Sequence, residues 1–321
     1  MSEASESHQP VPGRVVITGA SGFIGKAVGA RYRGLGSEVV GVDVVPDEAS
    51  GIIEGDTSVA GPWQDLVATG DLVVHTAALV SNTAGLQRAW EVNVLGTHHV
   101  LEAAAAGTTS RVLHLSSVRA FSDLDFPPDV DERHPVRPDG HSYVDTKIAS
   151  EQVALQAHAA GDVAVTVIRP GDVYGPGSVP WTFWPAVGIT AGTFAIPDQG
   201  DGIFSPVYVE NLVDGLVAAA ATPEAAGQVF TISDGIGITN TEFFSHYYRM
   251  LDREPEYLPA DELRVILEEA GIGGDTVDYL LRTNTYSIAK ARTLLGYEPK
   301  VDLAAGMARC ETWLRESGLL P

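Results

Sequence analysis

The chain has 321 residues, 45% of them hydrophobic, which is enough for one large domain or for a domain with an added lobe. Its formal net charge of −22 makes the surface repel DNA, RNA and anionic membranes, so we expect no nucleic-acid partner. The single cysteine, Cys310, excludes an intramolecular disulfide and a cysteine-rich zinc site, and it fits a reducing, cytoplasmic location.

Neither a leader nor a membrane span is expected. Residues 1–12 are polar and lack the apolar centre of a signal peptide, so they predict a disordered tail. No stretch reaches the ~18 consecutive apolar residues that a membrane-spanning helix needs. No metal is expected either, because His98 and His99 have no carboxylate at a ligand spacing.

The first predicted elements are a strand and a helix joined by a glycine-rich turn. Residues 14–17 form the strand, and residues 18–25 read Thr-Gly-Ala-Ser-Gly-Phe-Ile-Gly before a helical segment. Gly19 would permit the sharp turn, Gly22 the approach of backbone to a pyrophosphate, and Gly25 the close packing of helix on strand. The helix N-terminus would direct N–H groups at the phosphates. A glycine triplet can also close an ordinary turn, so the end of the next strand is needed to distinguish an ordinary turn from a dinucleotide-binding one.

The second predicted strand, 38–43, ends in a carboxylate. Asp43 lies about 20 residues after the glycine turn, where an acidic side chain can accept hydrogen bonds from the adenosine ribose of a dinucleotide. This argues against an ordinary turn. Asp43 would repel a 2′-phosphate, and Val44 and Val45 supply no arginine to hold one. The pattern therefore favours NAD over NADP.

Strands and helices continue to alternate along the chain. Strands are predicted at 71–75, 111–115 and 163–168, and helices at 87–106 and 143–159. This alternation predicts an α/β fold with a doubly wound parallel sheet of the Rossmann type. Ligands of such sheets bind at the carboxyl ends of the strands. The groups expected to ring one crevice are therefore the glycine turn, Asp43, Asp56, Thr76, Ser117 and the turn after Ile168.

Two residues on the predicted helix 143–159 form a candidate acid–base pair. Tyr143 and Lys147 are four residues apart and therefore share one face of the helix. A free phenol ionises near pH ~10, and a nearby ammonium favours the phenolate. Such a pair can move a proton on and off a hydroxyl group near neutral pH. The spacing alone is common, so the pair gains weight only from the motifs before it.

Taken in order, these motifs resemble the extended short-chain dehydrogenase/reductases, which include NAD-dependent epimerases, dehydratases and 3β-hydroxysteroid dehydrogenases. The resemblance covers nearly the whole chain after residue 12, and it is carried by segments 18–25, 55–57, 75–78, 92–97, 115–117, 143–147 and 169–177. It implies a Rossmann fold and NAD as the cofactor. The implied cofactor-binding residues are Gly19, Ser21, Gly22, Phe23, Ile24, Gly25, Asp43, Asp56, Thr57, Thr76, Ala77, Ala78, Tyr143, Lys147, Pro170 and Val173.

The resemblance also implies catalytic roles. Tyr143 would exchange a proton with the substrate oxygen, while Lys147 would lower the pKa of Tyr143 and hold the nicotinamide ribose. Ser117 would hydrogen-bond the substrate oxygen, and the register of the residues that follow favours it over Ser116. Asn93 would support a proton-relay water, with a purely structural role as the alternative.

Departures from the family pattern bear on the substrate. Nucleotide-sugar enzymes of this family typically carry an arginine for the diphosphate shortly before a segment like 206–211, and Phe204 stands at that position here. An apolar ring cannot pair with a diphosphate, whereas arginine pairs with it in a bidentate manner. A second arginine is expected near Val277 and is missing, with Arg282 as a displaced substitute. A nucleotide-sugar substrate is therefore disfavoured.

Other segments resemble the 3β-hydroxysteroid dehydrogenase-like branch. The sugar 4,6-dehydratases place Asp-Glu after the catalytic serine or threonine, where this chain has Val118-Arg119, so that chemistry is not expected. Segments 209–212, 284–287 and 295–299 are similar to the steroid branch. This implies a bulky apolar secondary alcohol or ketone as the substrate. The expected pocket residues are Val118, Trp181, Trp184 and Phe204, although the aromatic ones could instead belong to the core of a smaller lobe.

The expected organisation is an NAD-binding Rossmann domain followed by a smaller part. Residues 13–170 would bind NAD, and 171–321 would form a substrate lobe, with 203–235 returning to the Rossmann body. A cleft between the two parts is a natural ligand site. The acidic run 123–132 is expected to be a solvated loop.

Partners and function follow from the same resemblance. Family members commonly pair through helices such as 91–106 and 143–159, which implies a homodimer. Three functions remain open: an NAD-dependent dehydrogenase of secondary alcohols, an epimerase that retains its NAD, and a non-catalytic dinucleotide-binding protein. Phe204 argues against the second, and the presence of Ser117, Tyr143 and Lys147 argues against the third.

Overall fold

The computed structural model describes residues 11–122, 124 and 127–320. Of the predicted tail, only residues 11 and 12 fall within the described residues. Residues 123, 125 and 126 of the acidic run also lie outside them. None of the described helices is long and apolar enough to span a bilayer.

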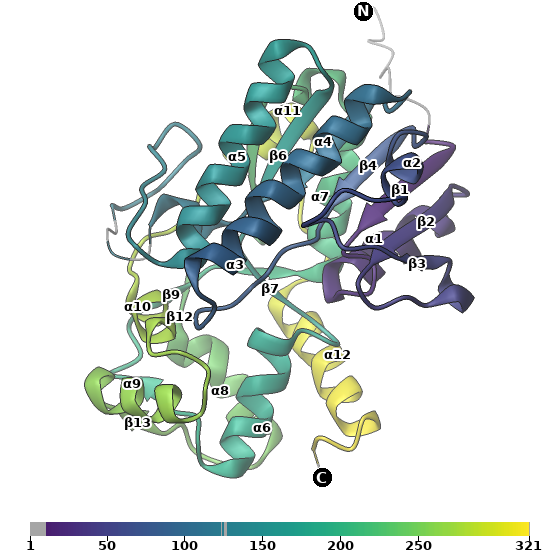
Figure 1. Cartoon of the computed structure of the whole chain (residues 1–321). Coiled ribbons are helices and arrows are strands. Elements are labelled where there is room, and N and C mark those ends of the chain that lie inside the picture. The colour runs from purple at the N-terminus through teal and green to yellow at the C-terminus, as the bar shows by residue number, and fades with distance from the viewer. Residues whose placement is uncertain (1–10, 123, 125–126, 321) are drawn as a thin grey trace, which may run out of the picture.

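Within the described residues, a seven-stranded sheet forms the body of the molecule, in the order β11-β6-β5-β4-β1-β2-β3 (Figure 1). Every neighbouring pair in it is parallel. The strands are β1 (Arg14–Thr18), β2 (Glu38–Asp43), β3 (Ile52–Glu54), β4 (Leu72–His75), β5 (Arg111–Leu115), β6 (Ala164–Pro170) and β11 (Val229–Ile232). The predicted α/β class with a Rossmann-type sheet is confirmed.

Helices cover both faces of this sheet. On one face lie α2 (Gln64–Val67), α3 (Leu86–Trp90), α4 (Gly96–Ala106) and α5 (Ser142–Ala160), with α4 beside α5 in Figure 1. On the other lie α1 (Phe23–Gly34), α7 (Val209–Ala221) and α11 (Ala289–Leu295). Successive residues of a strand point to opposite faces. Val15 and Ile17 therefore enter the core under α1 and α7, and Val16 enters the core under α4.

Short helical turns interrupt or join these elements. They are η1 (Glu48–Ser50), the π-helical turn η2 (Glu91–Leu95), η3 (Val118–Phe121), the π-helical turn η4 (Val179–Phe183) and η5 (Pro223–Ala225). The helix predicted over 87–106 is therefore divided into α3, η2 and α4. The π-helical turn lies at the level of Asn93, and its consequence for the site is described below.

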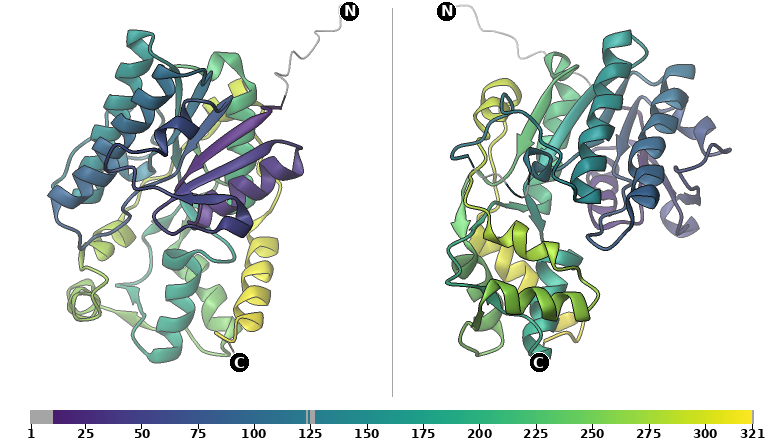
Figure 2. Two further views of the ribbon diagram at one scale, coloured as in Figure 1. Left: turned by 45° about the vertical axis from the view of Figure 1, so that its right-hand side comes forward. Right: turned by 60° about the vertical axis from the view of Figure 1, so that its left-hand side comes forward.

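A smaller lobe lies beyond the carboxyl ends of the strands, below the sheet in both views of Figure 2. Its helices are α6 (Trp184–Ala191), α8 (Asn240–Met250), α9 (Ala260–Glu269), α10 (Asp275–Leu281) and α12 (Leu303–Glu316). Its short strands pair as β7 (Asp172–Tyr174) with β10 (Pro206–Tyr208), β9 (Ile203–Phe204) with β12 (Ile238–Thr239), and β8 (Ile196–Pro197) with β13 (Tyr257–Leu258).

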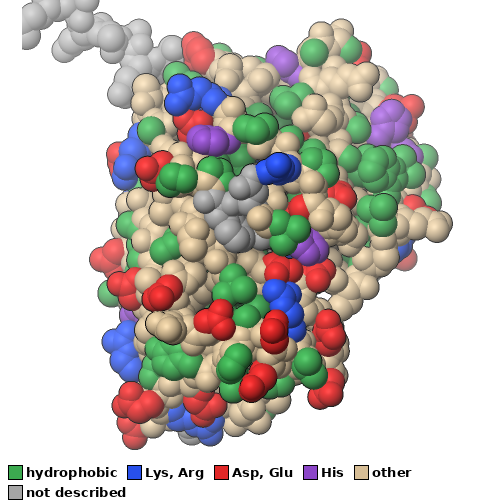
Figure 3. All heavy atoms as spheres, turned by 90° about the vertical axis from the view of Figure 1, so that its left-hand side faces the viewer, with side chains coloured by type: hydrophobic (Ala, Val, Ile, Leu, Met, Phe, Trp, Pro, Cys, Tyr) green, Lys and Arg blue, Asp and Glu red, His purple; other side chains and the backbone are tan. Residues whose placement is uncertain are grey.

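The lobe has its own aromatic core. Phe243 and Phe244 of α8 are fully buried and pack with Tyr174 and Phe204. The chain re-enters the body between the parts of the lobe, because β11 pairs with β6 and α7 packs on α1. It returns once more at α11, which contacts α7 and β11. On the face shown in Figure 3, acidic side chains are scattered over the lower part of the molecule, with lysine and arginine between them.

Candidate active site

The glycine-rich turn between β1 and α1 has a steric requirement for glycine. Gly19 has a positive φ of +74°, and a Cβ there would lie 2.6 Å from the backbone nitrogen of Ala77. A Cβ on Gly25 would lie 2.2 Å from the carbonyl oxygen of Gly19. Gly22 is the N-cap of α1 in an extended conformation. The first N–H groups of α1 therefore face a turn without side-chain bulk, which fits a bound pyrophosphate.

The carboxylate of Asp43 is fixed against the same turn. Its two oxygens accept hydrogen bonds from the backbone N–H groups of Ser21, at 2.9 Å, and Val45, at 3.0 Å. The Ser21 hydroxyl in turn donates to the carbonyl of Val45, at 2.5 Å. Asp43 thus lies at the end of β2 beside the glycine turn, which is the place expected for a ribose-binding carboxylate.

The remaining predicted cofactor residues follow neighbouring strands. Thr76 follows β4, and its hydroxyl donates to the carbonyl of Thr18 at 2.7 Å. Asp56 follows β3, and hydrogen bonds from Ser58 lower the pKa of its carboxyl group. The rest also lie at strand ends or at the start of α1, namely Phe23 and Ile24 in α1, Thr57 after β3, Ala77 and Ala78 after β4, Pro170 at the end of β6 and Val173 in β7.

Tyr143 and Lys147 lie in the first turns of α5, as predicted for a pair on one helical face. The Lys147 ammonium lies 5.9 Å from the centre of the Tyr143 ring. It also donates a hydrogen bond of 2.8 Å to the carbonyl of Leu115, the last residue of β5. Burial disfavours its charged form and lowers the pKa of Lys147 to about 8, although Glu151 opposes the shift.

The two serines after β5 differ in their contacts. The Ser117 hydroxyl oxygen accepts the backbone N–H of Arg119 at 3.2 Å and so caps the turn η3. The Ser116 hydroxyl is buried, and no hydrogen-bond partner for it is found among the described residues. Because Lys147 binds the carbonyl of Leu115, the end of β5 and both serines are held against α5.

Asn93 lies in the π-helical turn η2 and is buried. Its side-chain oxygen accepts the backbone N–H of Leu79 at 2.7 Å, and its amide donates to the Thr146 hydroxyl at 3.0 Å. Single π-helical turns inside helices occur frequently at functional sites. This turn directs the Asn93 amide at α5, one residue before Lys147. The Thr146 hydroxyl in turn donates to the carbonyl of Ser142 at 2.7 Å.

The predicted pocket residues are not gathered on one open wall. Val118 is fully buried with Phe121 and Tyr286, and Phe204 is 1% exposed and stacks on Phe243 with ring centres 3.8 Å apart. The pairing of β9 with β12 turns Phe204 towards α8. These two residues are therefore packed in cores, as the alternative for the aromatic residues expected of Phe204, and a role for either in a substrate pocket stays a prediction.

The two predicted tryptophans lie apart from each other. Trp184 is 42% exposed and meets Phe183 edge-on. Trp181 is partly buried between the edge of Phe204, at 5.0 Å between ring centres, and the face of Tyr279, at 5.6 Å. Of the four expected pocket residues, Trp181 contacts Tyr279, and Tyr279 in turn contacts Arg119, whose guanidinium lies beside Tyr143 of α5.

Arg282, the displaced diphosphate candidate, is buried in an ion pair. Its guanidinium pairs with Asp172 of β7, and the Tyr279 hydroxyl donates to the same carboxylate. The guanidinium also lies 3.8 Å from the centre of the Tyr279 ring. With 1% of its surface exposed, Arg282 ties α10 to β7 inside the lobe instead of presenting a free cation to a substrate.

Sequence reasoning missed Arg119 as a site residue. Its guanidinium lies 5.1 Å from the centre of the Tyr143 ring and 4.8 Å from that of Tyr279. It donates a hydrogen bond of 2.9 Å to the side-chain oxygen of Asn82, whose amide donates to Thr276 at 2.9 Å. These contacts join four separate segments, so no local pattern in the sequence signals them.

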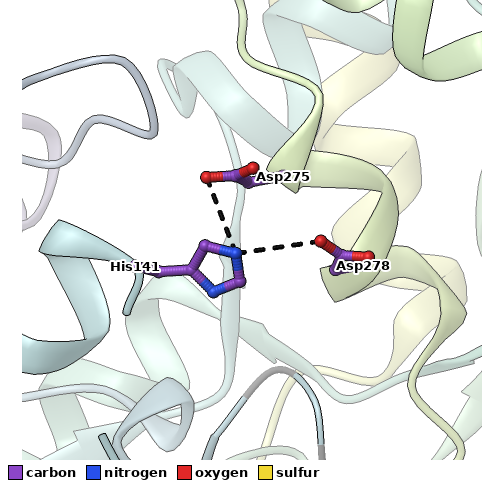
Figure 4. A group of neighbouring side chains, drawn as sticks. All are labelled: His141, Asp275 and Asp278. Atoms are coloured by element: carbon purple, nitrogen blue, oxygen red, sulfur yellow. Dashed lines mark ion pairs between the residues drawn. The ribbon is translucent and has the colours of Figure 1, made fainter. Parts of the chain in front are cut away.

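A second missed group joins α10 to the start of α5 (Figure 4). His141, the N-cap of α5, has its Nε2 atom 3.6 Å from Asp275 and 3.7 Å from Asp278. Its Nδ1 atom lies 3.2 Å from Asp139, and Arg264 pairs with the other oxygen of Asp278. The ligand atoms of His141, Asp275 and Asp278 lie within 4.8 Å of one another, which is close enough for one cation. A protonated His141 would make the same contacts as ion pairs.

Known proteins with similar sequences and structures span both substrate classes considered above. Over 335 residues the chain is 27% identical to a 3-beta-hydroxysteroid dehydrogenase of Mycolicibacterium neoaurum, covering 93% of this chain and 90% of the relative. Over 243 residues it is 30% identical to a 4-hydroxy-2-methyl-3-oxo-4-farnesyl-3,4-dihydroquinoline-1-oxide ketoreductase of Stigmatella aurantiaca, covering 72% and 71%. The structure of MoeE5 in complex with UDP-glucuronic acid and NAD matches with a TM-score of 0.80 and 26% identity, covering 95% of this chain and 100% of that one.

The family itself is shown by a match over most of the sheet and part of the lobe. Residues 15–233 match the model of the NAD dependent epimerase/dehydratase family. That family is NAD dependent, which agrees with the glycine turn and with Asp43 and confirms the predicted cofactor. The chain therefore belongs to the NAD dependent epimerase/dehydratase family of Rossmann proteins.

Proposed function

We propose that this protein is an NAD-dependent oxidoreductase that interconverts a secondary alcohol and a ketone on a bulky apolar substrate. In the oxidative direction, phenolate Tyr143 takes the hydroxyl proton while the carbinol C–H bond breaks and its hydride is transferred. Bound NAD supplies the hydride acceptor. Ser117 holds the substrate oxygen, and the Lys147 ammonium stabilises the phenolate. In the reductive direction the same proton returns from Tyr143 to the carbonyl oxygen.

One observation carries this proposal. The Lys147 ammonium, buried and hydrogen-bonded to Leu115, faces the Tyr143 ring from one turn away on α5. A buried cation beside a phenol is the arrangement needed to make tyrosine a base near neutral pH. Dinucleotide binding alone would use Lys147 for the nicotinamide ribose but would not need Ser117 together with Tyr143, so the non-catalytic alternative is disfavoured.

The apolar substrate is supported by what surrounds the site. A UDP-sugar carries two phosphates that need cations, but Phe204 is apolar and Arg282 is already paired with Asp172. Two of the similar proteins carry steroid or farnesyl-quinoline substrates in their names. We therefore favour a substrate with an extended apolar skeleton, of which a 3β-hydroxysteroid is one example. Trp181, beside Tyr279, is the best supported pocket residue.

The alternative is a nucleotide-sugar epimerase that retains its NAD and catalyses no net redox reaction. The likeness to MoeE5, solved with UDP-glucuronic acid and NAD, favours this reading, because it extends over nearly the whole of both chains. The oxidation step would use the same three residues. The two functions therefore differ in whether a diphosphate is bound and in whether NADH is released.

The wider organisation forms part of the same proposal. Residues 13–170 would bind NAD and 171–321 would bind the substrate, with 203–235 built into the body. A homodimer would form through α4 and α5, where Leu86, Trp90 and Leu95 of the adjoining segment are exposed. A cytoplasmic location agrees with the single, buried and free cysteine.

The decisive experiment measures NADH absorbance with NAD and a panel of secondary alcohols. The panel contains 3β-hydroxysteroids, long-chain alkyl carbinols and aryl carbinols, with UDP-glucose and UDP-glucuronic acid tested in parallel by product analysis. We expect NADH with an apolar alcohol, and Tyr143→Phe should abolish it while NAD binding persists. A UDP-sugar changed without NADH release would replace this function by epimerisation.

A further inference from the structure

We propose that Arg119 is a positioning residue for the acid–base chemistry, a second cation that, with Lys147, favours the phenolate form of Tyr143. The inference rests on the proposed role of Tyr143. It goes further by assigning a function to a residue that lies where the family's dehydratases carry an acid.

The position of the guanidinium carries the inference. Arg119 is 8% exposed, and its charge lies 5.1 Å from the centre of the Tyr143 ring, closer than the 5.9 Å of the Lys147 ammonium. Tyr143 is itself 8% exposed. Water screens charges weakly at such sites, so two cations at this range act strongly on one phenol. A cation over the ring also attracts it more when the ring becomes negative.

Contacts of both the backbone and the side chain hold Arg119 in place. Its backbone N–H donates to the Ser117 hydroxyl, which fixes the residue relative to the end of β5. Asn82, from the loop after β4, accepts a hydrogen bond from the side chain. Tyr279 of α10 covers the guanidinium with its ring at 4.8 Å. An arginine held this way stays beside the phenol instead of turning to solvent.

The other charged groups around Tyr143 are mostly paired with each other. Asp172 pairs with Arg282, and Glu151 pairs with Arg169 at 2.6 Å. Tyr279 remains neutral, because burial raises the pKa of its hydroxyl well above the ordinary value. Further titratable groups among the described residues lie on or around α5. They are His75 of β4, His114 of β5, Arg88 of α3, Glu91 of η2, His98, His99 and Glu102 of α4, Asp139 and His141 before α5, Asp145 and His158 on α5 itself, and Asp275 and Asp278 of α10. Among the residues that the structure describes, Arg119 and Lys147 are the cations found over the Tyr143 ring.

The arrangement also couples the lobe to the chemistry. Two of the residues that contact the Arg119 guanidinium connect it to α10, since Tyr279 belongs to that helix and the Asn82 amide donates to Thr276. The Arg119 guanidinium is therefore held beside Tyr143 when α10 of the smaller lobe lies against the sheet-containing part of the molecule. Docking of the lobe would in this way raise the fraction of Tyr143 that is ready to accept a proton.

The test is a direct titration of Tyr143 that needs no substrate. Tyrosinate absorbance of the full chain is recorded against pH, with and without the Tyr143→Phe change in each background, so that the difference reports Tyr143 alone. In Arg119→Gln we expect the midpoint of that difference to move up by about one pH unit. Arg119→Lys keeps the charge and should restore most of the shift. The matched control is Arg309→Gln, which removes a guanidinium 5.4 Å from the Tyr208 ring, remote from α5, and should leave the midpoint unchanged.

Each outcome decides the matter. An unchanged midpoint in Arg119→Gln, in protein that still binds NAD, overturns the proposal, and so does a shift that Arg119→Lys fails to reverse. If Arg119→Gln does not fold, Arg119→Lys and Asn82→Ala provide the comparison, and Asn82→Ala should give a smaller shift in the same direction. Because turnover is not measured, failure of the proposed alcohol substrate would leave this result intact.

Discussion

The side-chain amide of Asn93 donates a hydrogen bond of 3.0 Å to the hydroxyl of Thr146, which ties the π-helical turn η2 to the helix that carries Tyr143 and Lys147. The same amide group also satisfies the backbone of Leu79. Asn93 is thus a structural link between the loop after β4 and α5, and its partner Thr146 directly precedes Lys147 in the chain.

This link makes a prediction for Asn93→Ala. The change leaves the polar backbone groups of Leu79 without the Asn93 side chain, so we expect a loss of about 1–3 kcal/mol in the free energy of unfolding. The Thr146 hydroxyl loses one incoming hydrogen bond but still donates to the carbonyl of Ser142. Urea unfolding monitored by circular dichroism measures the loss of stability. Thr146→Ser keeps the hydroxyl and is the matched control, which removes one buried methyl group and should cost about 1 kcal/mol. A stable Asn93→Ala protein with reduced turnover would instead favour the proton-relay role.

Asp43→Ala tests the ribose assignment. The change removes the carboxylate that Ser21 and Val45 hold at the end of β2. We expect NAD affinity to fall roughly tenfold, as for the loss of one charge-assisted hydrogen bond. NADP affinity should fall less, because the repulsion of its 2′-phosphate disappears. Calorimetric titration with both cofactors measures the difference in affinity between NAD and NADP. Asp65→Asn, which changes an exposed carboxylate on α2, is the control. An unchanged preference for NAD would contradict the assignment.

Local requirements explain what the sequence could predict. Gly19 and Gly25 are needed because a Cβ at either position would overlap backbone atoms. This requirement is local, so the spacing of the glycines in the sequence is enough to predict the turn. The parallel strands follow from short apolar runs that are buried on both faces. Tyr143 and Lys147 are neighbours because of helical geometry alone.

Contacts between distant segments explain what could not be predicted. The burial of Phe204 depends on the pairing of β9 with β12, and its aromatic character fits a core as well as a pocket. The π-helical turn at Asn93 interrupts a segment whose periodicity is helical throughout. Arg119 reaches Tyr143 only because Asn82 and Tyr279, from other parts of the chain, surround it. Periodicity and propensity are local properties and contain no information about contacts between residues far apart in the sequence.

The ionisation of Lys147 predicts the alkaline side of the pH profile. Burial lowers the pKa of its ammonium to about 8, so the cation is present below that pH and lost above it. Without the cation the phenolate of Tyr143 is less favoured, and kcat/KM for alcohol oxidation should decline above about pH 8. Lys147→Arg keeps its charge throughout this range. We expect that variant to be slower but to lack the alkaline decline, and the same decline in it would show that another group titrates.

Two buried histidines predict sensitivity to acid. His75 at the end of β4 bonds Thr18 at 2.6 Å and Thr97 at 3.0 Å, and its ring stacks on that of His114 at 5.4 Å. Burial, with a smaller contribution from Lys147, lowers the pKa of His75 to about 3. The pKa of His114 is also lowered well below the ordinary value, first by burial.

The sign of the effect follows from proton binding. Below about pH 6.5 the unfolded chain protonates these imidazoles while the folded chain does not, so stability falls as the pH falls. Each histidine contributes a slope of about 1.4 kcal/mol per pH unit between its two pKa values. Urea unfolding at a series of pH values from neutral downwards measures the slope. His75→Gln should reduce the slope by the contribution of one proton, about 1.4 kcal/mol per pH unit. His98→Gln, which changes an exposed histidine on α4, is the control and should leave the slope as it is. Equal slopes in the His75→Gln and unmodified proteins would mean that His75 is already protonated in the folded chain.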